Sequence, residues 1–175
     1  MKILTEKQTV LYIRLLTLFF MAALVLSGVT AFPLETELRF LTGLLSISPN
    51  VPPETYTGLH FWLARVLQAL IETNKTYPFL AYGTDWLAFA HIVIAVLFIG
   101  FFAKPVRNQW IIYFGMIACA GIIPLALICG HLRGIPFYWQ MIDCSFGIFG
   151  FVPLYFLYIL VKKLEKMTNY PKLKY

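Results

Sequence analysis

The stretch GTDWLAFAHIVIAVLFIGFFA, residues 83–103, is apolar along almost its whole length and carries one acidic residue, Asp85. An α-helix needs about 20 such residues to cross the ~30 Å hydrocarbon core of a bilayer. In lipid every backbone N–H and C=O must find its partner within the segment, so a run of this kind folds as a helix. We therefore expect a membrane span over residues 83–103.

Three further apolar runs of similar length occur at residues 10–32, 109–132 and 139–161. The chain is 60% hydrophobic and 13% charged, whereas soluble domains are about 45–50% apolar and about 25% charged. The sequence therefore predicts an all-α integral membrane protein that lies in the lipid bilayer. We expect residues 1–175 to form one membrane domain, a four-transmembrane-helix bundle.

The first span ends in SGVTA, residues 27–31, whose small residues resemble a signal-peptidase site. Because the chain begins at Met1, we expect an uncleaved signal anchor.

The basic residues are distributed unevenly around the spans. Ten of the 14 Lys and Arg residues lie before or at the start of the first span, in the loop after residue 103, or after the last span. Cytoplasmic segments carry the excess of Lys and Arg, so both the N- and C-termini should be cytoplasmic, and we expect a bacterial inner membrane. The net charge of +6 follows this topological pattern and forms no single patch, so we expect no nucleic-acid partner.

Residues 33–82 then form an extracytoplasmic connection between spans 1 and 2. Pro33 is placed to open a helix with two glutamates in its first turn, and a second helix is expected over Glu54–Thr73. Arg65, Gln68 and Glu72 form a polar stripe on this helix, which predicts an amphipathic cap at the membrane surface. A fifth, tilted span is the alternative.

Residues 74–76, Asn-Lys-Thr, match a glycosylation acceptor.

This topology places seven side chains that are costly to bury in lipid in the outer half of the bundle. A charge at the centre of a membrane helix costs about 2.5–3.5 kcal/mol, so it usually faces the bundle and finds a partner. We therefore take these residues as candidate ligand-binding residues: His60, Arg65, Asp85, His91, His131, Arg133 and Asp143.

Structural roles compete with ligand binding at several of these positions. Arg133 is expected to pair with Asp143 or Asp85, and each aspartate also lies near a helix start, where the dipole favours a carboxylate. His91 is deeper and needs a hydrogen-bond partner, so it either forms a structural hydrogen bond or binds a ligand. Asp143, Gly147 and Gly150 share one helix face, and the glycines would let a neighbouring helix approach closely.

The first functional hypothesis is a binding module with a polar pocket in the outer half of the bundle. Its ligand would be a lipid headgroup, a small anion held by Arg65 and Arg133, or a partner membrane subunit. This hypothesis needs no catalytic residue. The confinement of the polar groups to one half of the membrane argues against a transporter.

The alternatives need a cofactor. His60, His131, Asp85 and Asp143 have the ligand types for zinc or iron in a metal-dependent membrane enzyme. A haem b protein would use His91 and another histidine as axial ligands. The three cysteines include no CxxC pair; we expect them to be packing residues, and a Cys129–Cys144 disulfide is the alternative.

Overall fold

A computed structural model describes residues 5–168, and its regular elements are helices. In chain order they are α1 (Glu6–Ala31), α2 (Leu34–Leu44), the 3₁₀ turn η1 (Pro53–Thr55), α3 (Gly58–Thr76), the 3₁₀ turn η2 (Pro78–Ala81), α4 (Tyr82–Ala103), α5 (Trp110–Leu132) and α6 (Phe137–Met167). Lys2, Lys172 and Lys174, which contribute to the predicted charge bias, lie outside the described residues.

Four helical segments of this part of the chain are long and apolar enough to cross a membrane: Glu6–Ala31, Pro78–Ala103, Trp110–Leu132 and Phe137–Met167. The predicted all-α fold with four spans is confirmed, as are the short helices between spans 1 and 2. Helix α3 is not among the candidate spans, so the sequence alternative of a fifth span gains no support.

The bounds of the last helix and of the cap helix differ from the prediction. The last helix continues to Met167 rather than ending at residue 161, because a helix can extend beyond the hydrocarbon core of the bilayer. In this extension Lys162 donates to Glu165 at 3.1 Å. The cap helix begins at Gly58 rather than Glu54, because Pro53–Thr55 form a separate 3₁₀ turn and Tyr56 is extended.

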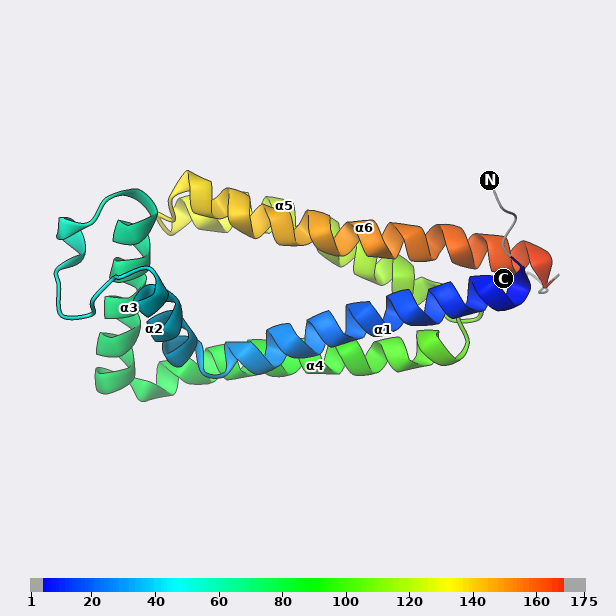
Figure 1. Ribbon diagram of the computed structural model, residues 1–175, viewed down its shortest axis with the longest axis horizontal. Coiled ribbons are helices and arrows are strands. Elements are labelled where there is room, and N and C mark those ends of the chain that lie inside the picture. Colours follow the sequence, from blue (N-terminus) through cyan, green and yellow to red (C-terminus); the bar gives the residue numbers. More distant parts are fainter. Residues whose placement is uncertain (1–4, 169–175) are drawn as a thin grey trace. The chain divides into compact units, whose positions relative to one another are not determined.

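The described residues form two compact units, whose boundaries fall inside α1 and α4. The first unit contains residues 5–23 and 94–168. Within it, α5 and α6 form an antiparallel hairpin (Figure 1). The turn between them contains Gly134 at a φ of +66°, a backbone conformation that glycine adopts without steric cost.

Glycines allow the two helices of this hairpin to approach closely. A Cβ added at Gly147 would lie 2.6 Å from the Cys119 carbonyl oxygen, and one at Gly150 would lie 2.8 Å from Cys119 Sγ. The predicted role of these glycines in close packing is confirmed. In the same unit the part of α1 up to Ala23 contacts the part of α4 from Ile94 onward, where the Phe20 and Phe98 ring centroids are 4.9 Å apart.

The second unit contains residues 24–93. The end of α1 packs against the start of α4 at Gly28, where a Cβ would lie 2.7 Å from the Ala88 carbonyl oxygen. Helix α2 packs on α3, and α3 runs across the direction of this part of α4 (Figure 1). Helix α3 is amphipathic as predicted: Leu63, Ala64 and Leu67 are buried, whereas the side chains of its polar stripe are exposed.

Candidate functional site

A cavity of about 420 Å³ opens within the second unit, where the spans meet the helices of the connection. Its wall comes from the end of α1, the start of α2, the end of α3, η2 and the first turn of α4. The lining residues are Phe32, Pro33, Leu34, Glu35, Thr36, Leu70, Thr73, Asn74, Leu80, Ala81 and Thr84. The volume lies in the range of small-molecule sites, about 300–1,000 Å³.

Two prolines explain why the chain turns at this place. Pro33 separates α1 from α2 and has no backbone N–H to continue the first helix. Pro78 opens η2 directly after α3 ends at Thr76. Both breaks fall next to the cavity, so its wall is built from helix ends and has polar backbone and side-chain groups beside apolar ones.

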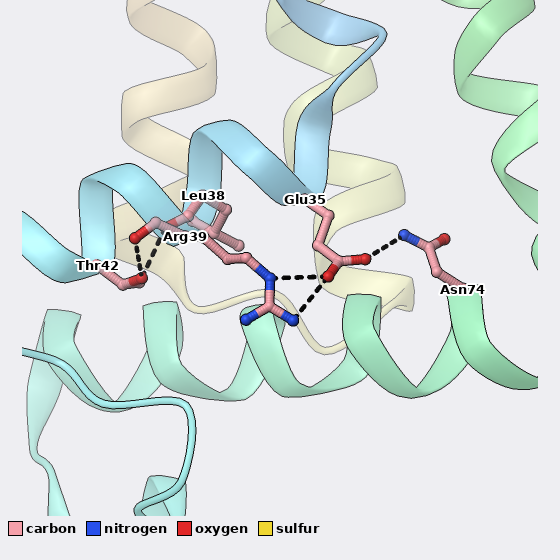
Figure 2. A network of polar contacts seen from close by, with 5 residues as sticks. All are labelled: Glu35, Leu38, Arg39, Thr42 and Asn74. Carbon is pink, nitrogen blue, oxygen red and sulfur yellow. Dashed lines mark hydrogen bonds and ion pairs between the residues drawn. The ribbon is translucent and has the colours of Figure 1, made fainter.

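The polar part of the wall is organised around Glu35 (Figure 2). Arg39, one turn further along α2, donates from Nε to Glu35 Oε1 at 2.8 Å, and its NH2 group also lies 2.8 Å from that oxygen. Asn74, in the last turn of α3, donates from Nδ2 to Glu35 Oε2 at 2.7 Å. The network therefore joins the start of α2 to the end of α3.

These contacts leave acceptor atoms beside the cavity. A carboxylate offers about four lone-pair sites: Arg39 uses two on Oε1, and Asn74 uses one on Oε2. Among the described residues nothing donates to Asn74 Oδ1. The hydrogen bond from Asn74, and then that from Arg39, hold the pKa of Glu35 below its ordinary value, so this carboxyl group is ionised at neutral pH.

An aromatic groove adjoins the cavity. It is lined by Phe32, Tyr82, Asp85, Trp86 and Phe89, measures about 270 Å³, and has an almost entirely apolar wall. The Trp86 ring is edge-on to both Tyr82 and Phe89, with centroids 5.9 and 6.3 Å away. Phe32 lines both the cavity and the groove, so the two hollows share a wall.

Asp85 thus lines the groove, and its carboxylate has no ion pair or hydrogen bond to the rest of the described chain. The other predicted residues of the second unit lie elsewhere. His91 Nδ1 is 2.8 Å from the Leu87 carbonyl oxygen, one turn back on α4, and the His91 Cβ packs against Gly28. Of the two alternatives for His91, the structure shows a hydrogen bond within its own helix; a ligand role for His91 stays a prediction. His60 and Arg65 are exposed on α3, where the Arg65 guanidinium lies 5.9 Å from the Phe61 ring centroid.

The remaining predicted residues belong to the first unit, at the turn between α5 and α6. His131 is exposed in the last turn of α5, Arg133 is exposed just after it, and Asp143 is half-buried in α6. Across residues 5–168 the ion pairs are Arg39–Glu35 and Lys162–Glu165. The predicted Arg133–Asp143 pair is therefore wrong: Arg133 is exposed in the turn after α5, whereas Asp143 is half-buried in the second turn of α6.

A buried amide takes the place of that ion pair in closing the turn. Gln140 is 5% exposed, and its Nε2 donates to the Ile135 carbonyl oxygen at 2.8 Å. Its side chain packs on Gly130, where a Cβ would lie 2.7 Å from Gln140 Cγ. Cys119, Cys129 and Cys144 are free, so the described chain has no Cys129–Cys144 disulfide.

The residue types suggested for a metal are divided between the two units. His60 and Asp85 lie in the second unit, and His131 and Asp143 lie in the first. Within either unit, residues 5–168 contain no group of three or more His, Cys, Asp or Glu side chains that could hold a metal ion.

No family model, curated protein or solved structure matches this chain.

None of the eleven residues that line the cavity was among the predicted ligand-binding residues. Two of them, Glu35 and Asn74, carry the hydrogen bond that joins α2 to α3. Glu35 was noted only as a favourable charge at a helix start, and Asn74 only as part of the glycosylation pattern. A signal was present for Arg39, because it follows Glu35 at i+4 on one helix face. Asn74 has no such local relation to Glu35, from which it is 39 positions distant.

Proposed function

We propose that this protein is a binding module: a small four-span membrane protein that holds the headgroup of a lipid in the cavity beside Glu35 and Asn74. The observation that carries the proposal is the mixed lining of this cavity. Phe32, Leu70 and Leu80 form apolar parts of the wall, and Glu35 and Asn74 supply hydrogen-bonding groups. An amphipathic molecule complements a wall of this kind, with its polar end at the carboxylate and the rest against the apolar surface.

The position of the cavity supports a lipid as this molecule. It lies where two candidate spans, α1 and α4, meet the helices of the connection, and we propose that the headgroup region of the bilayer begins at this level. We further propose that this end of the spans faces away from the cytosol, as the distribution of Lys and Arg predicts. The ligand would then come from the outer leaflet.

The lining favours a lipid over a small free anion. None of the residues that line the cavity is Lys, Arg or His. Glu35 and Asn74 leave two acceptors for a ligand, Glu35 Oε2 and Asn74 Oδ1, and one neutral donor, the second N–H of Asn74. Arg65, one of the two cations predicted to hold an anion, lies over the Phe61 ring instead.

Native mass spectrometry of the full chain, purified in a mild detergent, tests the proposal. We expect the wild type to retain phospholipid. Ala81→Phe should fill the cavity and release this lipid, whereas Ala90→Phe, an exposed position of α4 outside the cavity, should retain it.

Thr36→Phe narrows the cavity from its α2 side and is the second cavity-filling variant if Ala81→Phe does not fold. The proposal is wrong if the wild type carries no phospholipid. It is equally wrong if both filled variants carry as much phospholipid as the wild type.

A further inference from the structure

We propose that the bound lipid carries a primary amine in its headgroup and lays one acyl chain in the aromatic groove of Phe32, Tyr82, Trp86 and Phe89. This inference rests on the proposed function and adds the chemical class of the ligand.

The preference for an amine follows from the hydrogen-bonding atoms beside the cavity. Arg39 occupies Glu35 Oε1, but Glu35 Oε2 accepts only from Asn74 at 2.7 Å, and nothing in the described residues donates to Asn74 Oδ1. Both of these atoms are acceptors, so a ligand that satisfies them must donate, and a primary ammonium group has three N–H donors. The second N–H of Asn74 Nδ2 is also unused among the described residues, and it can donate to the phosphate of the same headgroup.

Charge selects the same headgroup. Glu35 is ionised, and a hydrogen bond between a charged donor and a carboxylate is about twice as strong as a neutral one. Among the residues that line the cavity, Glu35 is the only charged one. A trimethylammonium headgroup carries the cation but has no N–H, and a glycerol headgroup has hydroxyl donors but no cation. Neither one meets both requirements.

The groove accounts for an acyl chain. Its wall is almost entirely apolar, and Phe32 connects it to the cavity. One molecule can therefore place its headgroup at Glu35 and extend hydrocarbon past Phe32 along the rings of α4. Burial of apolar surface is favourable whatever the headgroup, so this contact contributes affinity without distinguishing one headgroup from another.

The test is a competition among three synthetic lipids with identical acyl chains, measured by native mass spectrometry on delipidated full-length protein. The probes are phosphatidylethanolamine, phosphatidylcholine and phosphatidylglycerol. We expect phosphatidylethanolamine to be retained most. Glu35→Gln keeps an acceptor oxygen but removes the charge, and should reduce this preference about fivefold, the difference between a charge-assisted and a neutral hydrogen bond.

The groove is tested separately with Trp86→Ala against Leu87→Ala. Both side chains are 59% exposed on α4, but only Trp86 lines the groove. Trp86→Ala should weaken retention of all three lipids and leave their order unchanged, and Leu87→Ala should behave as the wild type. If Trp86→Ala does not fold, Phe89→Leu removes another ring of the groove.

The outcomes separate the two proposals. Equal retention of the three lipids, or a preference for either of the other headgroups, overturns the amine assignment while leaving the lipid-binding function in place. Unchanged retention in the groove variants overturns the acyl-chain assignment. Absence of any lipid on the wild type overturns the proposed function itself.

Discussion

Glu35 has two kinds of contact that differ in what they hold together. Its bond to Arg39 lies within α2 at spacing i, i+4, and such exposed pairs contribute only about 0.3–0.5 kcal/mol. Its bond to Asn74 joins two helices that are distant in the sequence. The second contact therefore fixes how α2 and α3 meet at the cavity.

Removing the Asn74 amide should loosen this junction. We expect Asn74→Ala to cost about 1 kcal/mol of local stability, since it deletes a hydrogen bond to a charged group that is partly open to solvent. Asn74→Asp should cost more, because it sets a second carboxylate against Glu35. Hydrogen–deuterium exchange of Leu34–Leu44 measures both effects, and protection equal to the wild type in both variants would show that the bond does not hold α2.

The lowered pKa of Glu35 makes this junction sensitive to acid. A carboxyl group with a depressed pKa stabilises the fold at pH values above its ordinary value of 4.5 and loses that contribution as the pH falls through the lowered pKa. The difference in α2 protection between the wild type and Glu35→Gln should therefore be constant near neutral pH and shrink below about pH 4.5. A difference that grows on acidification would contradict the assignment.

At the scale of elements, the α5–α6 hairpin depends on close backbone contact. A Cβ at Gly147 meets a backbone carbonyl oxygen at 2.6 Å, whereas one at Gly121 meets nothing within 4 Å. We expect Gly147→Ala to destabilise the protein by about 1–3 kcal/mol through overpacking. Gly121→Ala should be neutral or stabilise the helix by about 0.5–1 kcal/mol.

Thermal unfolding in detergent measures this pair of variants. Cys119 and Cys144 are buried, so a thiol-reactive fluorophore reports their exposure, with Cys129→Ser as the common background. Equal transition temperatures for the two variants would show that α5 and α6 do not pack through Gly147.

The elements were largely predictable because their causes are local. A span is determined by about 20 consecutive apolar residues. The start of α2 is determined by Pro33 and by the glutamates in the first turn of this helix. The stripe of Arg65, Gln68 and Glu72 predicted the exposed face of α3. The end of α6 was not predictable from hydrocarbon length, since its last turns are polar and stabilised by Lys162 and Glu165.

The candidate site was less predictable because its contacts are not local. The sequence singled out residues whose side chains are costly to bury in lipid. In the structure, however, His91 bonds to its own helix, Arg65 lies over Phe61, and Arg133 does not reach Asp143. The cavity depends instead on two chain breaks, at Pro33 and Pro78, and on a bond between Glu35 and Asn74. Of the seven predicted residues, Asp85 alone lines one of the two hollows described.

At the scale of the whole molecule, the proposal depends on which side of the membrane the connection faces. We expect Lys75→Cys, exposed at the end of α3, to react with a membrane-impermeant maleimide on intact cells in a Cys129→Ser background. Arg107→Cys, exposed between α4 and α5, should react only after lysis. The reverse pattern would place the connection in the cytosol and the cavity in the inner leaflet.

The most direct measurement is an experimental structure of the full chain in nanodiscs that contain phosphatidylethanolamine. We predict elongated density that begins within hydrogen-bond distance of Glu35 Oε2 and Asn74 Oδ1 and passes Phe32 toward Trp86. A cavity closed by its own side chains, or one without lipid density, would contradict the claim that these helix ends form a lipid site.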